Sequence, residues 1–561
     1  MKLPRTLYAL IAILVLQFSG FAQAATQNTY VIAGTAVDHH SGQPLANTRI
    51  SVAPAGNPDQ SRSMLTSANG RFRFSNLVKG KYSLVGSHRG YLEQAFEQHE
   101  QYSSAIAVGD DQDSTHLVFR LHPDAAIHGR ILDENGEPVP QMQVWLFSTR
   151  NDLGRRSTRV TAQSTTNDLG EYSFAHLDEG TYYLLAMGKP WYASEEHPRL
   201  QATIRARNRG DGRTESAEHN EIVQREVDQL SKVYPLTFFD NVQDWTQASA
   251  IDLAPGDRFT ADFRVTAIAS AQIHLGAPEP QAEHSQPSQP RLRMPRLSIQ
   301  ARVFGDQTVP VNLSYSNTSD DEFVVRGIPP GRYEVRVQYP NDPHSVTQEL
   351  DIAGDMDLPK LTGGSGATVS GKFVWDGTPV TRGFGVTLTS SRTNHTYFCM
   401  SRAEGECSIP QTVQPGAYEV AVNSRLNDLY VKSVEIGGVK SAATVQIPES
   451  TDVNMTVTLA HGTGTINGIA LLDGKPKAGV MVVLAPADGW VGTVRFRRDQ
   501  SDSDGTFTLA NVVPGRYRVV ALSDGWRLPW SDPKVMKSYL TEGTAVQIGP
   551  DEKAQITVRV K

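Results

Sequence analysis

One pattern of alternating residues recurs five times along this chain of 561 residues, and it restricts the folds open to the chain. Each copy, called the frame here, opens with Gly-x-aromatic-x-apolar, reaches a second Gly about ten residues later and closes with a Tyr two residues after it. The clearest copies span 70–82, 170–182 and 505–517, and copies that have lost some of these residues span 323–333 and 405–418. Repetition of one unit predicts an array of similar domains.

The residues of the frame predict β-structure. Phe72 and Phe74 alternate with Arg71 and Arg73, so one face of a strand is buried and the other is wet. Pro-Gly pairs before the closing Tyr fit type II turns, in which Gly accepts a positive φ. We therefore predict that each frame is a β-hairpin, which must belong to a larger sheet because a lone hairpin is barely stable. With 46 Gly, 32 Pro and few helical patterns, the chain is expected to be all-β.

Strand and turn signals around the frames divide the chain into five predicted β-sandwich domains. Their expected boundaries are 29–123, 124–266, 267–361, 367–460 and 462–561. The second domain contains a charged insert at 199–233, in which apolar residues at helical spacing predict one short amphipathic helix over 218–232. This helix either covers a sheet edge, the commoner role, or presents its apolar face to a partner. The third domain is the least regular, and its Pro- and Gln-rich stretch 277–295 is typical of a mobile loop.

The first 24 residues have the pattern of a cleavable signal peptide. Lys2 and Arg5 precede an apolar run at 7–18, and a small-x-small site predicts cleavage between Ala24 and Ala25. The apolar run is too short for a membrane span, and no later stretch is apolar enough to form one. We expect export, with no transmembrane segment in the mature chain, to the periplasm, the outer surface or the extracellular space.

The chain has two cysteines, Cys399 and Cys407, which flank a predicted turn at 402–405. The turn would place them on facing strands of the fourth hairpin, so a cross-strand disulfide is expected in an oxidising compartment. The competing hypothesis, a redox or metal site, lacks further Cys ligands and a His cluster.

The complete unit has a Gly-x-Val/Ile strand, a Gly-x-Pro turn, an Asp/Asn-x-Gly-x-Phe/Tyr segment and a Pro-Gly-x-Tyr return. It resembles the carboxypeptidase regulatory-like family over nearly all of 29–561, most closely in the first, second and fifth copies. The stretch 234–265 also resembles long secreted bacterial proteins that carry several such units. The resemblance implies prealbumin-like, or Ig-like, β-sandwiches that serve as accessory or binding modules. Related families include starch-binding-like domains and Cna B-type domains, which often form a Lys–Asn isopeptide bond beside a Glu. No equivalent triad is found here, so we predict no such bond.

Motifs for catalysis are weak. A zinc carboxypeptidase needs a His-x-x-Glu pair and a distant His, but the one such pair, His176 and Glu179, falls inside the second frame, where a solvent-facing turn is the simpler interpretation. His-Glu-x-x-His and Gly-x-Ser-x-Gly motifs do not occur. We therefore predict no enzyme activity, no catalytic residue, no cofactor and no metal site. The Asp-rich turns 502–505 and 109–113 offer oxygens to Ca²⁺, although such turns also select Asp without a metal. A net charge of −7 gives no reason to expect nucleic acid.

Aromatic residues supply the candidate binding site. Tyr91, Trp191 and Trp526 each stand nine residues after a closing Tyr. Their rings either stack on sugars or share a structural role at the end of the core, and the recurrence favours the second interpretation. Trp490 and Trp530 lie outside the frame and are expected to be exposed, which makes the fifth domain the expected binding face.

These observations predict an exported, non-catalytic string of about five β-sandwiches that binds or scaffolds at the cell envelope or outside the cell. Rigid modules in tandem extend reach and multiply weak contacts. The alternative is a carbohydrate-binding protein that uses loop aromatics. A more distant alternative is an accessory module of a peptidase that acts in trans. Expected partners are a polysaccharide or an envelope protein.

Overall fold

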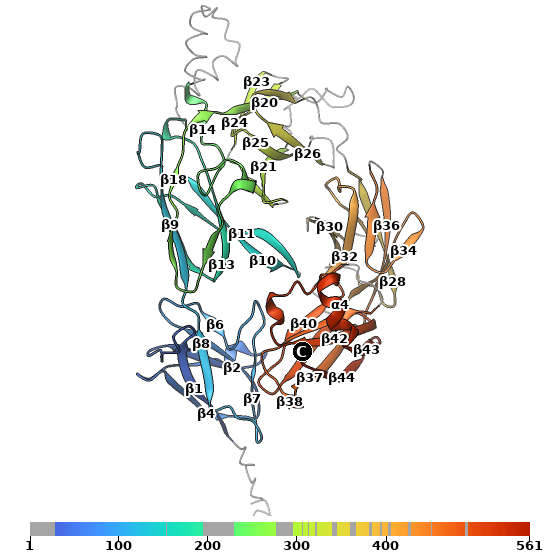
Figure 1. Ribbon diagram of the computed structural model, residues 1–561. Coiled ribbons are helices and arrows are strands. Elements are labelled where there is room, and N and C mark those ends of the chain that lie inside the picture. Colours follow the sequence, from blue (N-terminus) through green and yellow to red (C-terminus); the bar gives the residue numbers. More distant parts are fainter. Residues whose placement is uncertain are drawn as a thin grey trace, which may run out of the picture.

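The structure is a computed structural model that describes residues 29–152, 154–193, 229–276, 296–305, 307–311, 313–319, 322–338, 345–358, 366–380, 384–392, 395–401, 405–424, 428–449, 452–487 and 492–561. Nearly every described element is a strand, and the strands form five β-sandwiches (Figure 1). The predicted all-β fold is therefore confirmed. The sandwiches are numbered one to five by the strands given below, and the residue boundaries predicted above stay predictions. The predicted signal peptide lies outside the described residues.

Sandwich one shows the arrangement that the others repeat. Its first strand, β1 (Tyr30–Asp38), pairs antiparallel with β4 (Arg71–Leu77) and parallel with β8 (Leu117–Leu121). The second sheet has the order β3 (Arg62–Leu65), β2 (Arg49–Pro54), β5 (Gly80–Ser87) and β6 (Gln94–Ala95), and β7 (Ile106–Val108) also pairs with β5. The short 3-10 helix η1 (Pro58–Gln60) follows β2.

Sandwiches two and three have the same pairings. In sandwich two, one sheet contains β12 (Glu171–Leu177), β9 (Ala125–Leu132), β17 (Arg258–Thr260) and β18 (Phe263–Arg264), and the other contains β11 (Arg155–Thr165), β10 (Gln143–Asp152), β13 (Gly180–Met187), β15 (Thr237–Phe238) and β16 (Ile251–Leu253). In sandwich three the sheets are β23 (Ser314–Ser319), β24 (Glu322–Ile328), β20 (Ala271–Gly276), β27 (Met356–Leu358) and β22 (Gln307–Pro310), β21 (Arg296–Val303), β25 (Gly331–Gln338), β26 (Ser345–Ile352). The pair β14 (Lys232–Val233) and β19 (Ile268–Ala269) lies between them, and two 3-10 helices follow β13 and β15, η2 (Trp191–Ala193) and η3 (Trp245–Gln247).

Sandwiches four and five complete the array. In sandwich four the sheets are β31 (Glu406–Ser408), β28 (Val369–Asp376), β36 (Val453–Ala460), β33 (Tyr430–Ile436), β34 (Val439–Ser441) and β30 (Thr396–Met400), β29 (Phe384–Ser390), β32 (Gly416–Ser424), β35 (Thr444–Ile447). In sandwich five they are β38 (Lys475–Pro476), β37 (Gly464–Leu472), β41 (Thr506–Val512), β44 (Lys553–Arg559) and β40 (Arg497–Gln500), β39 (Met481–Pro486), β42 (Gly515–Leu522), β43 (Thr544–Ile548). In all five sandwiches the first strand pairs in parallel with the last, which shows that the irregular third copy is the same unit.

The frame is not a hairpin, and this prediction is wrong. Its two strands lie in opposite sheets of each sandwich: β4 pairs with β1, whereas β5 pairs with β2. In four of the frames, the first strand carries a β-bulge with a left-handed residue four positions before the second Gly, with φ of 58° at Asn76, 56° at His176, 80° at Gly327 and 54° at Asn511. The strand ends one residue later, and the chain then crosses to the other sheet. Gly515, which a type II turn would require at positive φ, lies outside the left-handed region. Alternation of apolar residues marks a half-buried strand but does not identify its neighbour, so it fits both arrangements.

The closing Tyr of every frame fills the core and also makes a hydrogen bond to the main chain. All five are buried, and each donates its hydroxyl to the carbonyl four residues earlier: Tyr82 to Val78 (3.0 Å), Tyr182 to Asp178 (2.9 Å), Tyr333 to Pro329, Tyr418 to Gln414 (2.7 Å) and Tyr517 to Val513 (2.6 Å). A buried hydroxyl without a partner is costly, and a similar tyrosine bond fixes a corner of immunoglobulin-type sandwiches. The bond therefore fixes the crossing between the sheets.

The cores lie between the sheets. Phe74, Phe174 and Leu509 are 6%, 5% and 1% exposed, as the alternation predicts. One core continues across a joint: Phe304 of sandwich three contacts the rings of Phe147 and Phe238 in sandwich two, at centroid distances of 4.8 and 5.7 Å.

The two cysteines form the predicted disulfide, with a Cα–Cα distance of 5.4 Å. It does not join facing strands of a hairpin, because Cys399 is on β30 and Cys407 is on β31, in opposite sheets. The bridge is buried and ties the two sheets of sandwich four together. Gly371 of β28 packs against it so closely that an added Cβ would lie 2.8 Å from the sulfur of Cys407.

Helices differ from the prediction. Most of the helix expected at 218–232 and the loop expected at 277–295 lie outside the described residues, although Gln229 and Leu230 are helical. Sandwich five contains an unpredicted helix, α4 (Pro533–Thr541), which buries Met536 and Leu540. Asp532 accepts a hydrogen bond from the Lys534 amide at its start, a common N-cap followed by Pro. No helix in the described part of the chain is long and apolar enough to span a membrane.

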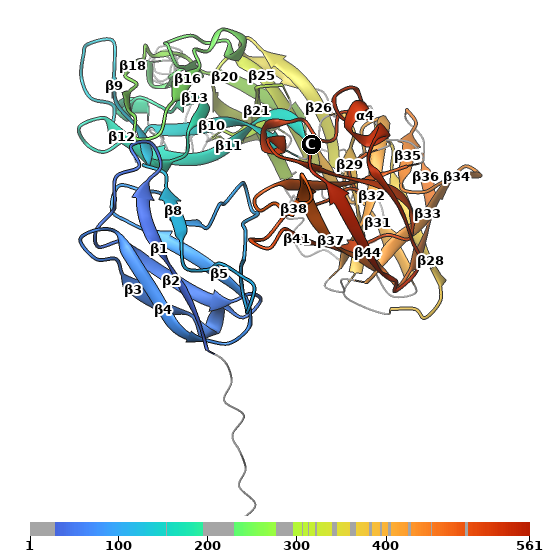
Figure 2. The same ribbon diagram turned by 60° about the horizontal axis from the view of Figure 1, so that its bottom comes forward.

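The five sandwiches do not form an extended string. Both views show the chain returning on itself, so that sandwich one, coloured blue, lies beside sandwich five, coloured red (Figures 1 and 2). The array is a closed ring, and the expectation of extended reach is wrong. The sequence patterns used above are local within each domain and carry no information about contacts between the first and the last.

Candidate functional site

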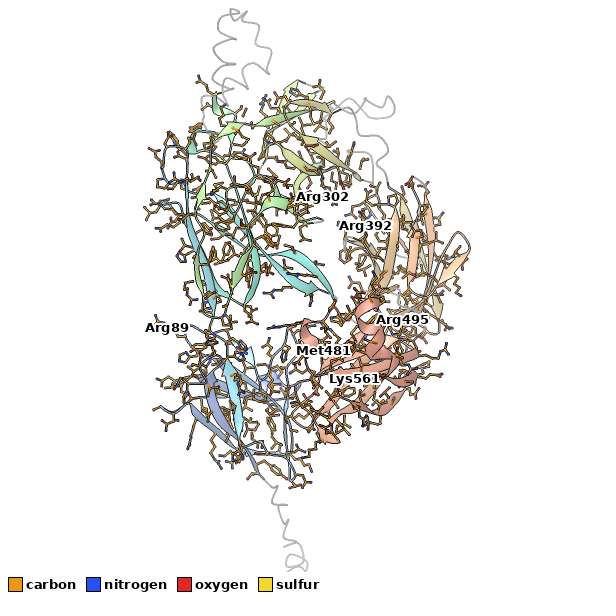
Figure 3. All side chains as sticks on the ribbon, in the orientation of Figure 1. Arg89, Arg302, Arg392, Met481, Arg495 and Lys561 are labelled. Atoms are coloured by element: carbon orange, nitrogen blue, oxygen red, sulfur yellow. A yellow bond between two sulfur atoms is a disulfide. The ribbon has the colours of Figure 1, made fainter. Side chains whose placement is uncertain are left out.

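Among the described residues, the largest set of polar and aromatic contacts between sandwiches lies where the ring closes. Sandwich one contributes Lys81 and the segment 97–107, and sandwich five contributes the segment 498–506 with Trp526. This set of residues is called the closing interface below. Trp530 packs against Arg498 within sandwich five. Side chains of the two sandwiches meet along this boundary beside Met481, which is labelled in Figure 3 and whose sulfur lies 3.8 Å from the guanidinium of Arg498.

Main-chain groups form one part of the closing interface. The Ser503 amide donates to the Ala105 carbonyl (3.0 Å), and the Ala107 amide donates to the Ser503 hydroxyl (2.8 Å). The Ala105 amide donates to a carboxylate oxygen of Asp502 (2.8 Å). These bonds satisfy polar groups along β7, and a covered strand edge is protected from pairing with other chains.

A buried glutamine organises the second part. Gln500, at the end of β40, is 1% exposed, and its partners lie in sandwich one. Its side-chain amide donates to the Glu97 carbonyl (2.6 Å) and the Ser104 hydroxyl (3.0 Å), and its oxygen lies 3.0 Å from Nδ1 of His99. The Ser104 hydroxyl donates in turn to the Ser501 carbonyl (2.9 Å). A fully satisfied buried network of this kind favours one relative position of the two surfaces.

Two ion pairs cross the boundary with opposite polarity. Lys81 of sandwich one pairs with Asp502, donates to the Thr506 hydroxyl (2.5 Å) and lies 3.9 Å from Asp504. Arg498 of sandwich five pairs with Glu100 at 2.7 Å, and the Arg498 side chain is 7% exposed.

Burial affects the acidic groups of sandwich five. It raises the pKa of Asp502, and the nearby Lys81 ammonium opposes this effect. Burial also raises the pKa of the neighbouring Asp499 to about 6, although the Thr508 amide donates to its carboxylate (2.7 Å).

Aromatic rings form the last part. Trp526 stacks on His99 with a centroid distance of 4.9 Å and an interplanar angle of 5°, and it contacts Tyr102 at 5.7 Å. The guanidinium of Arg498 lies 4.4 Å from the ring centroid of Trp530 and 5.2 Å from that of Tyr102, both within cation–π range.

The predicted ligand-stacking aromatics therefore have different surroundings. Trp530 is 5% exposed, so its expected exposure is wrong, and Trp526 packs in the closing interface. Tyr91 donates to Asp38 (3.0 Å), and burial together with Asp38 raises its pKa to about 12. Trp191 is 79% exposed, with one ring contact to Tyr192 at 5.8 Å, so the three frame-related rings do not share one structural role. Trp490 lies outside the described residues.

Sandwich five also contacts two other sandwiches. Asn151, near the tip of the β10–β11 ribbon of sandwich two, donates to the Arg527 carbonyl (3.0 Å), and Arg527 pairs with Glu179 at 3.3 Å. In sandwich four, Glu419 accepts from the Thr493 hydroxyl (3.2 Å). The last sandwich is thus fixed against sandwiches one, two and four.

The His-x-x-Glu pair does not converge on one point. Nδ1 of His176 lies 2.7 Å from the buried carboxylate of Asp124, which also pairs with Arg258 at 2.7 Å, whereas Glu179 faces Arg527. Asp124 lies between β8 and β9, so His176 and Arg258 hold the joint between sandwiches one and two. Sequence reasoning missed this role because Asp124 and Arg258 are far apart in the chain.

The Asp-rich turns have partners within the protein. Asp504 accepts from the Thr506 amide (3.0 Å), Asp110 accepts from the Tyr30 hydroxyl (2.7 Å), and Asp113 accepts from the Thr115 amide (3.0 Å). Within the described ranges, no group of three or more His, Cys, Asp or Glu residues is placed to hold a metal ion. The ionised groups of the closing interface pair with each other across the boundary, so they hold the two sandwiches together.

Comparison with known proteins gives one family. The carboxypeptidase regulatory-like domain matches residues 31–122 and 126–211, which correspond to sandwich one and the first part of sandwich two. No curated protein matches the chain.

Several solved structures show weak similarity. The TIE protein of Bacillus anthracis is 9% identical over 100% of this chain and 79% of that chain, with a TM-score of 0.17. The minor pilin GBS52 of Streptococcus agalactiae is 12% identical over 46% of this chain and 100% of that chain, with a TM-score of 0.19. The major pilin subunit BcpA of Bacillus cereus is 8% identical over 95% of this chain and 99% of that chain, with a TM-score of 0.14. At these scores the likeness carries no argument about function.

Proposed function

The carboxypeptidase regulatory-like domain matches sandwich one and the first part of sandwich two, and from this match we propose that the protein is a non-catalytic scaffold or binding module. It acts at the cell envelope or outside the cell, and it is exported by the signal peptide expected at 1–24. One observation carries the proposal: in the part of the chain that the structure describes, the largest set of polar and aromatic contacts between sandwiches holds the first and last sandwiches together.

A ring that is closed in this way holds its sandwiches in fixed positions before any partner binds. Sandwiches joined by flexible linkers would lose conformational entropy when they bind one partner together, whereas a fixed ring has already lost it. Several sandwiches can therefore contact one envelope protein or polysaccharide at the same time, and weak contacts add. The buried Gln500 network and the shared apolar core at Phe304 support such rigidity.

The proposal is tested by retention on envelope material. Purified mature protein is incubated with an isolated envelope fraction and with insoluble envelope polysaccharide, and the pellet is analysed. We expect the wild type to be retained and a variant with an opened ring, Lys81→Glu, to be retained several-fold less. Equal retention of both proteins, or retention of neither, contradicts the proposal.

A second candidate function, carbohydrate binding, is favoured by the exposure of Trp191. Trp191 is 79% exposed and lies beside the partly exposed Tyr192, with an interplanar angle of 86° between the two rings. Its ring offers an apolar face of the type on which sugars stack. Trp191→Ala should then abolish retention on polysaccharide. The matched control is Phe398→Ala, which removes another exposed ring, 51% exposed, from β30 of sandwich four. If both variants bind as the wild type does, Trp191 is not the sugar-stacking residue.

A further inference from the structure

The two sides of the closing interface come from different sandwiches, sandwich one and sandwich five. The residues that meet across it are about 400 positions apart in the chain, with separations of 401 for His99 and Gln500 and 421 for Lys81 and Asp502. Its bonds are hydrogen bonds, ion pairs and ring contacts, and none of the contacts described above is covalent. Nothing in this chemistry requires both sides to come from the same chain.

The charges on each side of the closing interface are complementary to those on the other side. Sandwich one presents the cation Lys81 and the anion Glu100, and sandwich five presents the anion Asp502 and the cation Arg498 in matching places. Hydrogen bonds also match across the boundary: the Ser104 hydroxyl donates to the Ser501 carbonyl, and the Gln500 side-chain amide donates to the Ser104 hydroxyl. The surface of sandwich one therefore fits sandwich five, whether that sandwich belongs to the same copy or to another.

The joint next to sandwich one is short. Strand β8 ends at Leu121 and β9 begins at Ala125, so three residues connect sandwiches one and two. Rotation about this joint breaks the contacts of Asp124 with His176 and Arg258, but it leaves the pairing of β8 with β1 and of β9 with β17 intact. It would separate the two sides of the closing interface without unfolding either sandwich. Exchange of an identical domain between copies needs only such a hinge and an interface that is already complementary.

We propose that the closing interface is a docking surface for a second copy of this chain, in which sandwich one of each copy binds sandwich five of the other. This inference rests on the closed ring of the proposed function. The exchanged pair has two-fold symmetry and satisfies both interfaces, so it ends at two copies and does not continue as a filament. The single-copy ring is favoured at low concentration because its own sandwich one has the higher effective concentration.

The test uses charge reversal in the full mature chain. Lys81→Glu places a like charge beside Asp502, and Asp502→Lys places a like charge beside Lys81, so each variant alone should be an open monomer. In an equimolar mixture, one interface of the exchanged pair has Glu at 81 facing Lys at 502, and the other has the natural Lys81 facing Asp502. We expect light scattering after size exclusion to show a doubled mass for the mixture alone.

The control is the chain that carries both substitutions, which should be a compact monomer because its own charges are complementary again. A mixture that stays at the mass of one copy, while each single variant is expanded and the double variant is compact, overturns the exchange and leaves the ring intact. Single variants that are as compact as the wild type overturn both, since the ring then does not depend on this interface.

The second ion pair gives an independent version of the experiment, with Glu100→Arg and Arg498→Glu. Circular dichroism first shows whether each variant is folded. If a variant of the Lys81–Asp502 pair does not fold, the Glu100–Arg498 pair tests the exchange instead. The same doubled mass is expected for this mixture, and its absence counts against the proposal in the same way.

Discussion

Arg498 offers the sharpest test of how the ring is held closed. Substitution by Ala removes two contacts across the boundary, the ion pair with Glu100 and the cation–π contact with Tyr102, and it also removes the contact with Trp530 inside sandwich five. Truncating one partner of a buried charge pair costs roughly 2 kcal/mol or more, and the lower limit applies here because the Glu100 side chain is 31% exposed. A desolvated cation–π contact adds about 1 kcal/mol. The closing interface should therefore lose about 3 kcal/mol, or about 150-fold in its opening equilibrium, since 1.4 kcal/mol is tenfold.

Native-state hydrogen exchange measures this opening directly. The amides of Ala105, Ala107 and Ser503 are bonded across the boundary, so they become exchangeable when the ring opens. In Arg498→Ala they should exchange about 150-fold faster, while amides of β28 and β36 in sandwich four keep their rates. The matched control is Arg49→Ala, whose pair with Glu93 is exposed on both sides (61% and 62%) and should change exchange by only a few-fold. Unchanged exchange at Ala105 and Ser503, or equal acceleration in sandwich four, would refute the reasoning.

Three further predictions concern single sandwiches. Because the pKa of Asp499 is raised to about 6, its ionisation penalises the folded state: the penalty is absent below the pKa of the unfolded chain and complete above pH 6, so stability falls as pH rises between them. Asp499→Asn should remove this fall and stabilise sandwich five by up to about 3 kcal/mol at pH 7.5, and a denaturant titration that shows the same pH dependence in both proteins rules this out. Replacing Cys399 and Cys407 with Ala opens a loop with a separation of 8 residues, which should cost about 2.5 kcal/mol in chemical unfolding of sandwich four, whereas a change below about 0.5 kcal/mol would show that the bridge is not stabilising. Tyr517→Phe keeps the ring but leaves the Val513 carbonyl without its donor, so a loss of about 1–2 kcal/mol is expected, and no loss in thermal unfolding would remove the role assigned to this bond.

The repeated frame was the most informative part of the sequence. It correctly predicted the strands, their buried faces at Phe74, Phe174 and Leu509, and the number of sandwiches, because apolar alternation reports directly on burial. It predicted a hairpin where the chain crosses between sheets, because the same alternation fits both neighbours. The five bonds of the closing tyrosines could have been suspected from a Tyr at one frame position in every copy, since a hydroxyl buried five times needs five partners.

The closing interface could not be predicted in the same way. Gln500, Ser104 and Glu100 belong to no motif, and their partners are about 400 residues distant. The sequence predicts a structural role at the end of the core for Trp526 and exposure for Trp530. Neither prediction includes packing between sandwiches one and five, because the spacing of aromatic residues within one domain carries no information about another domain. The Cys399–Cys407 pairing was predictable from the cysteine count, whereas its position across two sheets depended on the same crossing that the hairpin prediction missed.

Zero-length carbodiimide cross-linking at high dilution, followed by mass spectrometry of the monomer band, tests the closed ring most directly. The reagent joins an ammonium and a carboxylate only when they touch, and Lys81 touches Asp502 across the closing interface. The closed ring predicts a cross-linked peptide pair containing Lys81 and Asp502, recovered together with the pairs Lys432–Asp376 and Lys561–Glu542, which lie within sandwiches four and five. Recovery of these two internal pairs without the Lys81–Asp502 pair would show that the first and last sandwiches are apart in solution.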